Sequence, residues 1–210
     1  MTDNTVFDSV FKTMVHRVPQ LIIPFINEAF GRHYSQDAQL ITFNDEHETA
    51  LGTRIDDTVF RLEDKIYHIE CQSDSDANIV VRMIEYDFAI GLEMALRTGK
   101  PCEIEFPESC VLFLRHTVNT PDMLSIKINL PDGTSFDYHT KVFKAQEVGS
   151  EELFEKHLLI LLPYYLMRYE KQLTTIDGDD TETTKLVAEC ASLRNQLELA
   201  TLGMGNGLLY

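Results

Sequence analysis

Residues 54–73, RIDDTVFRLEDKIYHIECQS, contain two runs of alternating polar and apolar residues on either side of a short polar pair, Glu63-Asp64. Alternation with a period of two residues is typical of a β-strand with one buried face. The runs 54–62 and 65–72 are therefore predicted to be antiparallel strands joined by a two-residue turn. The hairpin lies between a predicted N-terminal helical segment and a predicted helix at 78–99.

The length of the turn determines how the two strands pair. With a two-residue loop, Leu62 faces Lys65, and counting outward places Asp57 directly opposite Glu70 on the same face. This register is an inference, because Glu-Asp is not a favoured pair for a tight type I′ turn. A three-residue loop would change the pairing.

A cation is expected between these two carboxylates, because facing like charges repel each other. A hard divalent ion with oxygen ligands, such as Mg²⁺, is one solution. The spacing leaves a second solution open, in which the hairpin face is solvated and Arg61 or Lys65 supplies the counter-charge. His68 and Gln72 share the Glu70 face, whereas Cys71 points into the core as a small hydrophobic side chain.

The segments around the hairpin predict an α/β fold with a mixed central sheet. The region 1–173 is expected to form the domain, and 174–210 an acidic linker followed by a short helical tail. We expect helices over 5–30 (interrupted at Pro19 and Pro24 and ended by Gly31), 78–99, 151–173 (kinked near Pro163) and 183–200, and strands over 39–45, 110–116, 123–130 and 134–140.

Composition limits the classes of function. Eighteen basic and thirty-four acidic residues give a net charge of −16, which argues against a broad nucleic-acid-binding surface but not against a local basic groove. The four cysteines lack C-x-x-C spacing, which argues against a zinc site and favours free thiols in a reducing compartment. The first residues do not resemble a signal peptide, and no apolar run has the length of a membrane span. We therefore expect a cytoplasmic protein.

The helix at 78–99 has two predicted faces. An apolar face suited to packing on a sheet leaves Arg82 and Tyr86 together on the opposite side, one turn apart. The pattern alone leaves open whether Arg82 binds a ligand or is a solvent-facing side chain paired with Tyr86 or an acid. The apolar face comprises Val80, Ile84, Phe88, Gly91 and Ala95, and Glu93 lies on the opposite face.

The Asp57, Glu70-x-Gln72 pattern, followed by VRMIEYDFAI at 81–90, resembles the signature of the PD-(D/E)XK nuclease superfamily. The resemblance is nearer to the recombination-promoting nucleases, a family also named for transposases, in which Gln commonly replaces the superfamily Lys. It spans roughly residues 7–173. It implies a restriction-endonuclease-like αβββαβ core with flanking helices.

The resemblance also implies roles for individual residues. Asp57, Glu70 and the backbone carbonyl of Cys71 would hold Mg²⁺ or Mn²⁺, which would lower the pKa of a bound water for attack on a phosphodiester. Gln72 would orient that water or a phosphate oxygen by hydrogen bonding. Arg82, supported by Tyr86, would contact a DNA phosphate.

Three further residues are weaker candidates for the same site. Lys12 is a candidate phosphate contact, although an exposed lysine needs no such role. Glu28 is a candidate extra ligand, with a plain surface carboxylate as the alternative. His68 is either a neighbour of the metal site or a structural histidine.

Two functions are therefore expected from different classes. The first is a metal-dependent DNA endonuclease of low sequence specificity, associated with mobile elements or recombination, that has no organic cofactor and no membrane partner. The second is a catalytically weak protein of the same fold that acts through a protein partner or as a homodimer. The net charge and Gln72 favour the second alternative.

Overall fold

The computed structural model describes residues 4–43, 58–73, 78–100, 102–169 and 180–205, and it divides the chain into two compact units, Met1–Ala145 and Gln146–Tyr210. The domain boundary predicted from the sequence, between residues 173 and 174, lies outside the described residues. Within the described helices, none is both long and apolar enough to cross a lipid bilayer.

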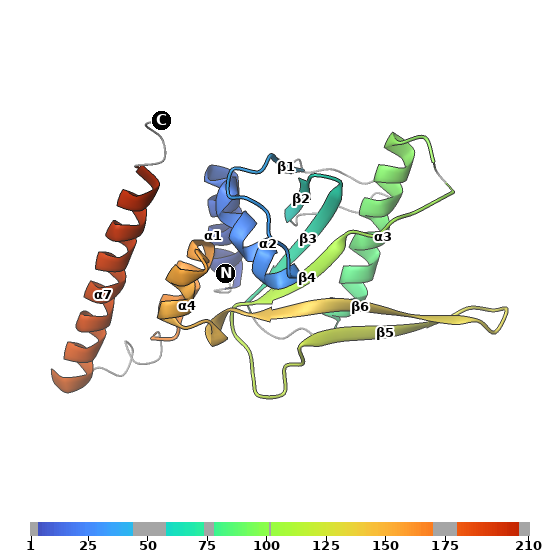
Figure 1. Cartoon of the computed structure of the whole chain (residues 1–210). Helices are drawn as coiled ribbons and strands as arrows, with labels where there is room; N and C mark the ends of the chain where they lie inside the picture. Colours follow the sequence, from blue (N-terminus) through green and yellow to red (C-terminus); the bar gives the residue numbers. More distant parts are fainter. Residues whose placement is uncertain (1–3, 44–57, 74–77, 101, 170–179, 206–210) are drawn as a thin grey trace. The chain divides into compact units, whose positions relative to one another are not determined.

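Six strands form one mixed sheet in the order β1-β2-β3-β4-β6-β5 (Figure 1). Neighbouring strands are antiparallel from β1 to β3, the β3–β4 and β4–β6 pairs are parallel, and β5 and β6 form an antiparallel hairpin. This arrangement confirms the predicted α/β class with a mixed central sheet. The strands are β1 (Leu40–Thr42), β2 (Thr58–Leu62), β3 (Lys65–Gln72), β4 (Glu108–Phe113), β5 (Met123–Asn129) and β6 (Ser135–Lys144).

The predicted register of the central hairpin is confirmed for the residues that the structure describes. Leu62 pairs with Lys65, and Thr58 pairs with Ile69 at the other end of the ladder. The turn places Glu63 at a φ of 54°, a conformation that costs a side chain with a Cβ atom about 1–2 kcal/mol. Asp57, predicted to follow in this register, lies outside the described residues.

The first helical segment is interrupted where the sequence predicts. It comprises α1 (Asn4–Arg17), a 3₁₀ turn η1 (Pro19–Leu21) and α2 (Ile22–Phe30). Gly31 then ends α2 in the left-handed conformation, with a φ of 65°, and its amide donates to the carbonyl of Asn27. Glycine adopts this conformation without the steric cost that other residues incur.

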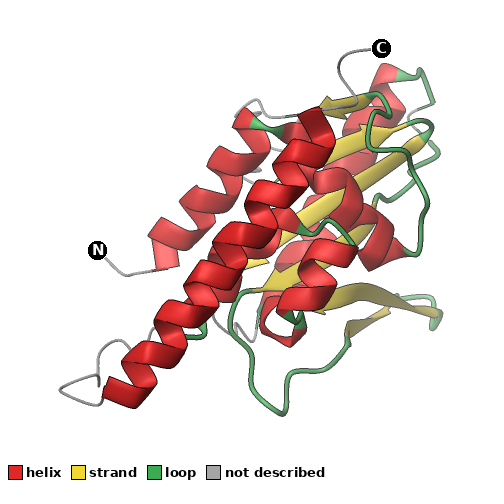
Figure 2. Cartoon of the chain, turned by 60° about the vertical axis from the view of Figure 1, so that its left-hand side comes forward, coloured by secondary structure: helices red, strands yellow, loops and turns green. Residues whose placement is uncertain are grey.

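Within the unit Met1–Ala145, helices lie on both faces of the sheet (helices are red and strands yellow in Figure 2). Phe30 of α2 packs on Tyr67 of β3, with ring centroids 5.0 Å apart. Consecutive strand residues point to opposite faces, so His68 lies on the other face. That face is covered by α3 (Ile79–Arg97), whose Met83 packs in a buried cluster with strand residues of β4 and β6.

The predicted orientation of α3 is wrong in part. Phe88, assigned to the sheet-packing face, is 40% exposed, whereas Met83 and Asp87 are buried. The helix is turned so that polar side chains, Asp87 and Arg82, point toward the sheet, and this is possible because each meets a polar partner there. Gly91 is required for a different contact, since a Cβ atom at this position would lie 2.7 Å from the carbonyl oxygen of Glu105.

The second unit contains α4 (Ser150–Glu155), the 3₁₀ turn η3 (Leu159–Leu161), α5 (Leu162–Met167) and α7 (Asp180–Gly205). The prediction of one helix over 151–173 kinked near Pro163 is wrong. The helix breaks earlier, where His157 has a φ of 55°, and Pro163 lies in the first turn of α5, where a missing amide hydrogen costs nothing. Arg168 stacks 3.8 Å above the ring of Tyr165.

Candidate functional site

The carboxylate of Glu70 is buried on β3 and belongs to a polar cluster. The residue is 5% exposed, and its Oε1 atom accepts a hydrogen bond of 2.6 Å from Nε2 of Gln72. The same oxygen accepts a second hydrogen bond from Nη2 of Arg82, which forms an ion pair with it. We name these three residues, Glu70, Gln72 and Arg82, the Glu70 cluster.

Arg82 therefore does not have the predicted position. It was expected on the helix face opposite the sheet, available to a DNA phosphate, but it reaches from α3 back to β3. The reason is electrostatic, because a buried carboxylate needs a counter-charge and Arg82 provides it. The Arg82 side chain is 36% exposed, so the ion pair is buried at the carboxylate and accessible to water at the guanidinium. The counter-charge was expected from Arg61 or Lys65 in the alternative without a metal ion, and the described structure assigns it to α3.

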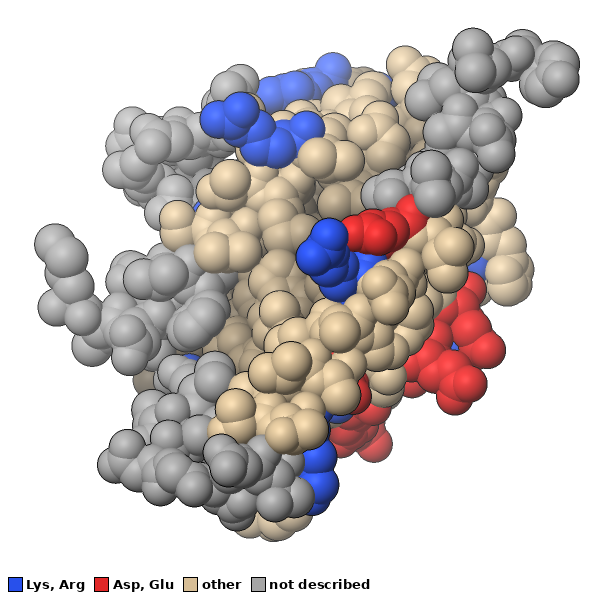
Figure 3. All heavy atoms as spheres, turned by 90° about the vertical axis from the view of Figure 1, so that its left-hand side faces the viewer, with Lys and Arg blue, Asp and Glu red and all other residues tan. Residues whose placement is uncertain are grey.

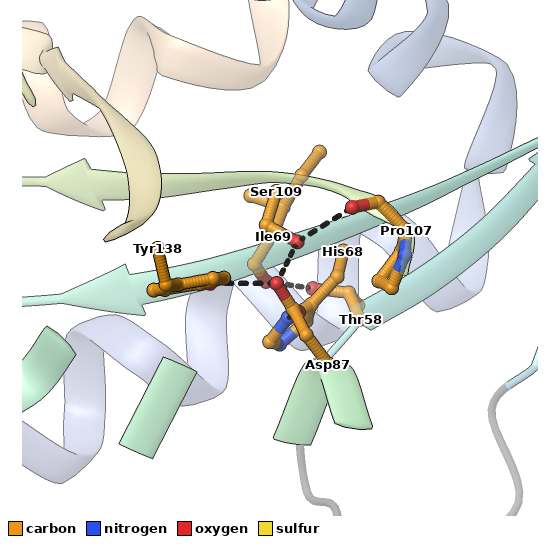
Figure 4. Close-up of polar contacts among 7 residues, drawn as sticks. All are labelled: Thr58, His68, Ile69, Asp87, Pro107, Ser109 and Tyr138. Carbon is orange, nitrogen blue, oxygen red and sulfur yellow. Dashed lines mark hydrogen bonds and ion pairs between the residues drawn. The ribbon is translucent and has the colours of Figure 1, made fainter. Parts of the chain in front are cut away.

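A second carboxylate on the same side of the sheet accepts hydrogen bonds from three strands. Asp87 of α3 is 1% exposed, and its Oδ1 lies 2.6 Å from Nδ1 of His68. Its Oδ2 accepts from the hydroxyls of Ser109, at 2.7 Å, and Tyr138, at 2.6 Å. Figure 4 shows the carboxylate between these three side chains. We name Asp87, His68, Ser109 and Tyr138 the Asp87 cluster.

The Asp87 cluster joins α3 to β3, β4 and β6. An ionised carboxylate only accepts, so Nδ1 of His68 carries the hydrogen when Asp87 is charged. Burial and, to a lesser degree, the charge of Asp87 raise the pKa of Tyr138 well above its usual value, which keeps its hydroxyl a donor. The arrangement supports the structural interpretation of His68, which is fully buried.

Tyr86 also differs from the prediction. Its ring packs against the His68 imidazole, with ring centroids 6.2 Å apart at an interplanar angle of 64°. It therefore supports the buried histidine rather than lying with Arg82 on a face turned away from the sheet. Glu93, predicted on the same outer face, forms an ion pair with Arg97 one turn later.

Sequence reasoning missed Asp87, Ser109 and Tyr138. One signal was available for Asp87, which lies four residues after Met83 and three before Ile90, so a carboxylate interrupts an apolar stripe at helical spacing. Such a position predicts a buried, hydrogen-bonded carboxylate. Ser109 and Tyr138 gave no comparable signal, because their proximity to Asp87 depends on the parallel pairing of β4 with β3 and of β6 with β4.

The remaining candidates are not members of either cluster. The thiol of Cys71 is buried, as predicted, and its backbone carbonyl stays a predicted ligand. Glu28 is exposed on α2, the helix that covers the other face of the sheet, which agrees with the surface-carboxylate interpretation. Lys12 lies on α1 with a partly buried side chain, and its predicted contact with phosphate stays a prediction.

The described residues fit a divalent ion only in part. Glu70 offers a carboxylate and Gln72 an amide, and both are oxygen ligands of the type that Mg²⁺ accepts. However, no group of three His, Cys, Asp or Glu side chains within the described ranges could hold a metal ion. Asp57, the second carboxylate of the predicted pair, lies outside those ranges.

Comparisons with known proteins add no relative. No protein-family model, curated protein or solved structure matches the chain.

Charged side chains are unevenly distributed over one face of the molecule (Figure 3). On the face drawn in Figure 3, acidic side chains gather at the lower right, whereas basic side chains lie in several separate places. The charged side chains visible among the described residues of this face (Figure 3) do not form one broad positive surface of the kind that nucleic acids bind. A contact with phosphate would depend on individual cations such as Arg82.

Proposed function

We propose that the chain is a divalent-metal-dependent DNA endonuclease of the PD-(D/E)XK type, with low sequence specificity and an association with mobile elements or recombination. One observation carries the proposal: a buried carboxylate, an amide and a partly exposed guanidinium converge at the end of β3, at the positions of the sequence signature. A metal-dependent phosphodiesterase can use such groups, with a carboxylate to hold the ion and with hydrogen-bond donors and cations to stabilise the charge that develops on the phosphate.

The order of the elements supports the proposal. A helical segment, three antiparallel strands, a helix and a strand parallel to the third follow one another along the chain. The sequence signature implies the same αβββαβ order, with its Glu-x-Gln on the third strand. Here Glu70 and Gln72 lie on that third strand, and α3 follows it directly.

Each residue has a defined task in this proposal. Glu70 and, from the sequence, Asp57 and the carbonyl of Cys71 would hold a divalent ion. When bound, the ion would supply a water of lowered pKa and positive charge at the scissile phosphate. Gln72 would orient the water or a phosphate oxygen through its amide, and Arg82 would bind a phosphate oxygen of the backbone.

Nicking of supercoiled plasmid tests the proposal. The wild-type protein is expected to nick in Mg²⁺ or Mn²⁺ and not in EDTA. Glu70→Gln is expected to lose at least about 100-fold in rate, because losing even a hydrogen-bond partner of a metal ligand typically costs about 10–100-fold in metal affinity or activity. Gln preserves the volume of Glu70 and can still meet Arg82.

Glu108→Gln is the matched control for Glu70→Gln. Glu108 also forms an ion pair with an arginine, Arg32, and lies on the neighbouring strand β4. This variant should nick at the wild-type rate. Nicking that persists in Glu70→Gln, or that is lost equally in both variants, would contradict the assigned role of Glu70.

A second candidate function is an interaction protein that uses the same fold without efficient catalysis. The observation that favours it is the Arg82–Glu70 ion pair, which already balances the charge of the carboxylate within the chain. In this case the protein would not nick in any divalent metal, and analytical ultracentrifugation would show a dimer or a stable complex with a partner.

A further inference from the structure

We propose that Arg82 and a divalent cation compete for the same oxygen of Glu70. Arg82 then acts as an internal counter-ion that balances the site without metal, and it is released toward a phosphate when metal binds. This inference rests on the proposed function and adds a means of regulating its site.

The burial of Glu70 makes a counter-charge necessary in the absence of metal. Its side chain is 6% exposed, and an ionised carboxylate removed from water is costly unless it is paired. Arg82 is paired with it through Nη2. Because Arg82 neutralises Glu70, the carboxylate can stay buried and ionised without a metal ion. Two buried carboxylates without a counter-charge would repel each other and could not both stay ionised.

Oε1 of Glu70 is the oxygen at which the two cations are proposed to compete. A carboxylate oxygen offers about two lone pairs, and Oε1 of Glu70 accepts from both Gln72 and Arg82. A metal ligated at this oxygen must replace one of these donors. Arg82 is the donor that leaves, because two cations on one oxygen repel each other, whereas neutral Gln72 can turn and present its amide oxygen.

The surroundings allow the Arg82 side chain to move while its backbone stays in place. The guanidinium is reached by water, since the side chain is 36% exposed. The helix itself is fixed by the adjacent Met83, which packs in the core, and just over one turn later by Asp87 with its three hydrogen bonds. Release therefore turns a side chain, not a helix, and it frees a guanidinium that can bind phosphate oxygens in a bidentate manner.

Titration with Mn²⁺ without DNA tests the competition directly. Electron paramagnetic resonance counts free Mn²⁺, and the affinity can be compared for wild type, Arg82→Gln, Glu70→Gln and the control Arg32→Gln. Arg82→Gln should bind Mn²⁺ at least about fivefold more tightly than wild type, the lower end of usual coupling between sites. Arg32→Gln removes the cation of the other pair, Arg32–Glu108, and should leave the affinity unchanged.

Glu70→Gln makes the outcomes distinguishable. Tighter binding in Arg82→Gln that is abolished by adding Glu70→Gln supports the competition. Equal or weaker binding in Arg82→Gln, with wild-type binding that depends on Glu70, overturns the competition and leaves the proposed function intact. Binding by Arg82→Gln but not by wild type supports the competition and contradicts a native metal-dependent endonuclease. Binding by neither protein overturns both proposals.

Arg82→Lys keeps the test valid if Arg82→Gln does not fold in EDTA. Lysine retains the positive charge but not the planar fork of arginine, so it should pair less well with Glu70. The expected result is a larger rise in melting temperature on adding Mn²⁺ than wild type shows, by about 2–4 °C. An equal or smaller rise overturns the competition.

Discussion

The Asp87 and Glu70 clusters lie on the same face of the sheet but reverse the roles of helix and strand. In the first, the helix supplies the carboxylate and the strands supply the donors; in the second, the strand supplies the carboxylate and the helix supplies a cation. The donors to Asp87 are an imidazole and two hydroxyls, whereas the main donor to Glu70 is a water-accessible guanidinium. The carboxylate of Asp87 therefore holds the fold together, whereas the partner of the Glu70 carboxylate is the one proposed to be exchangeable.

The largest loss of stability is expected from removing the central carboxylate of the Asp87 cluster. Asp87→Ala leaves the donors of His68, Ser109 and Tyr138 without their acceptor in a dry interior, and it should lower the free energy of unfolding by about 3–5 kcal/mol. Denaturant unfolding followed by circular dichroism measures the loss. Glu85→Ala, an exposed carboxylate on the same helix, should change the stability by less than about 0.5 kcal/mol. A loss below about 1 kcal/mol in Asp87→Ala would show that the cluster does not hold the helix.

A smaller loss of stability is expected from a change in the Glu70 cluster. Glu70→Gln removes the charge that Arg82 balances but leaves the guanidinium in contact with water, so the loss in unfolding free energy should be about 1–3 kcal/mol. Glu108→Gln, in which both partners of the ion pair are about one-third exposed, should lose less than about 1 kcal/mol. Equal losses of unfolding free energy in Glu70→Gln and Glu108→Gln would contradict the prediction that the buried carboxylate contributes more to stability than the exposed one.

Alkaline pH should lower the free energy of unfolding through Tyr138 of the Asp87 cluster. Its pKa is raised in the folded protein from a usual value of 10.0, first by burial and then by Asp87. Below pH 10 both states keep the proton, whereas above it only the unfolded state releases it, so stability falls as the pH rises. By pH 11 the loss attributable to Tyr138 should reach about 1.4 kcal/mol.

Tyr138→Phe is the control for this pH dependence. The pKa of Tyr67 is also raised by burial and by Tyr34, so the wild-type curve contains more than one tyrosine. The unfolding free energies of wild type and Tyr138→Phe should therefore converge between pH 9 and pH 11. Parallel curves would show that the hydroxyl of Tyr138 keeps its proton no more tightly in the folded state.

The smallest effect is expected at the turn that joins β2 to β3, the strand that carries Glu70 and His68. Glu63 has a positive φ that glycine adopts readily, so Glu63→Gly should raise the free energy of unfolding by about 0.5–1 kcal/mol, after the greater entropy of the unfolded glycine chain is taken into account. Asp64→Gly, at the neighbouring position without a positive φ, should not stabilise the protein. A loss of stability in Glu63→Gly would contradict strain at this turn.

The hairpin register could be predicted because strand alternation and a two-residue loop leave few alternatives. The face of α3 could not, because apolar spacing assigns every charged side chain to solvent, whereas Arg82 and Asp87 point toward the sheet and meet partners there. The break near His157 was missed because Pro163 was a more obvious cause of an interruption. In each case the deciding interaction joins residues that the local pattern does not relate.

The candidate site was predicted in composition but not in arrangement. Glu70, Gln72 and Arg82 were named from the sequence, and the structure brings these three together. The sequence left open whether Arg82 meets a ligand or pairs with Tyr86 or an acid, and it did not identify Glu70 as that acid. A sequence signature identifies which residues belong to a site. It does not show which of those residues form hydrogen bonds and ion pairs with one another when no ligand is bound.

The separation of the partners along the chain has a consequence for how the domain assembles. Glu70 and Arg82 are 12 residues apart, whereas Tyr138 reaches Asp87 across 51 residues and only after β6 has joined the sheet. Contacts between near neighbours in sequence close at a lower entropic cost than distant ones. During synthesis the Glu70–Arg82 ion pair can therefore form before β6 is made. The hydrogen bond from Tyr138 to Asp87 can form only after β6 has been synthesised. A chain that ends before β6 would hold its charge balance at Glu70 and lack the last donor to Asp87.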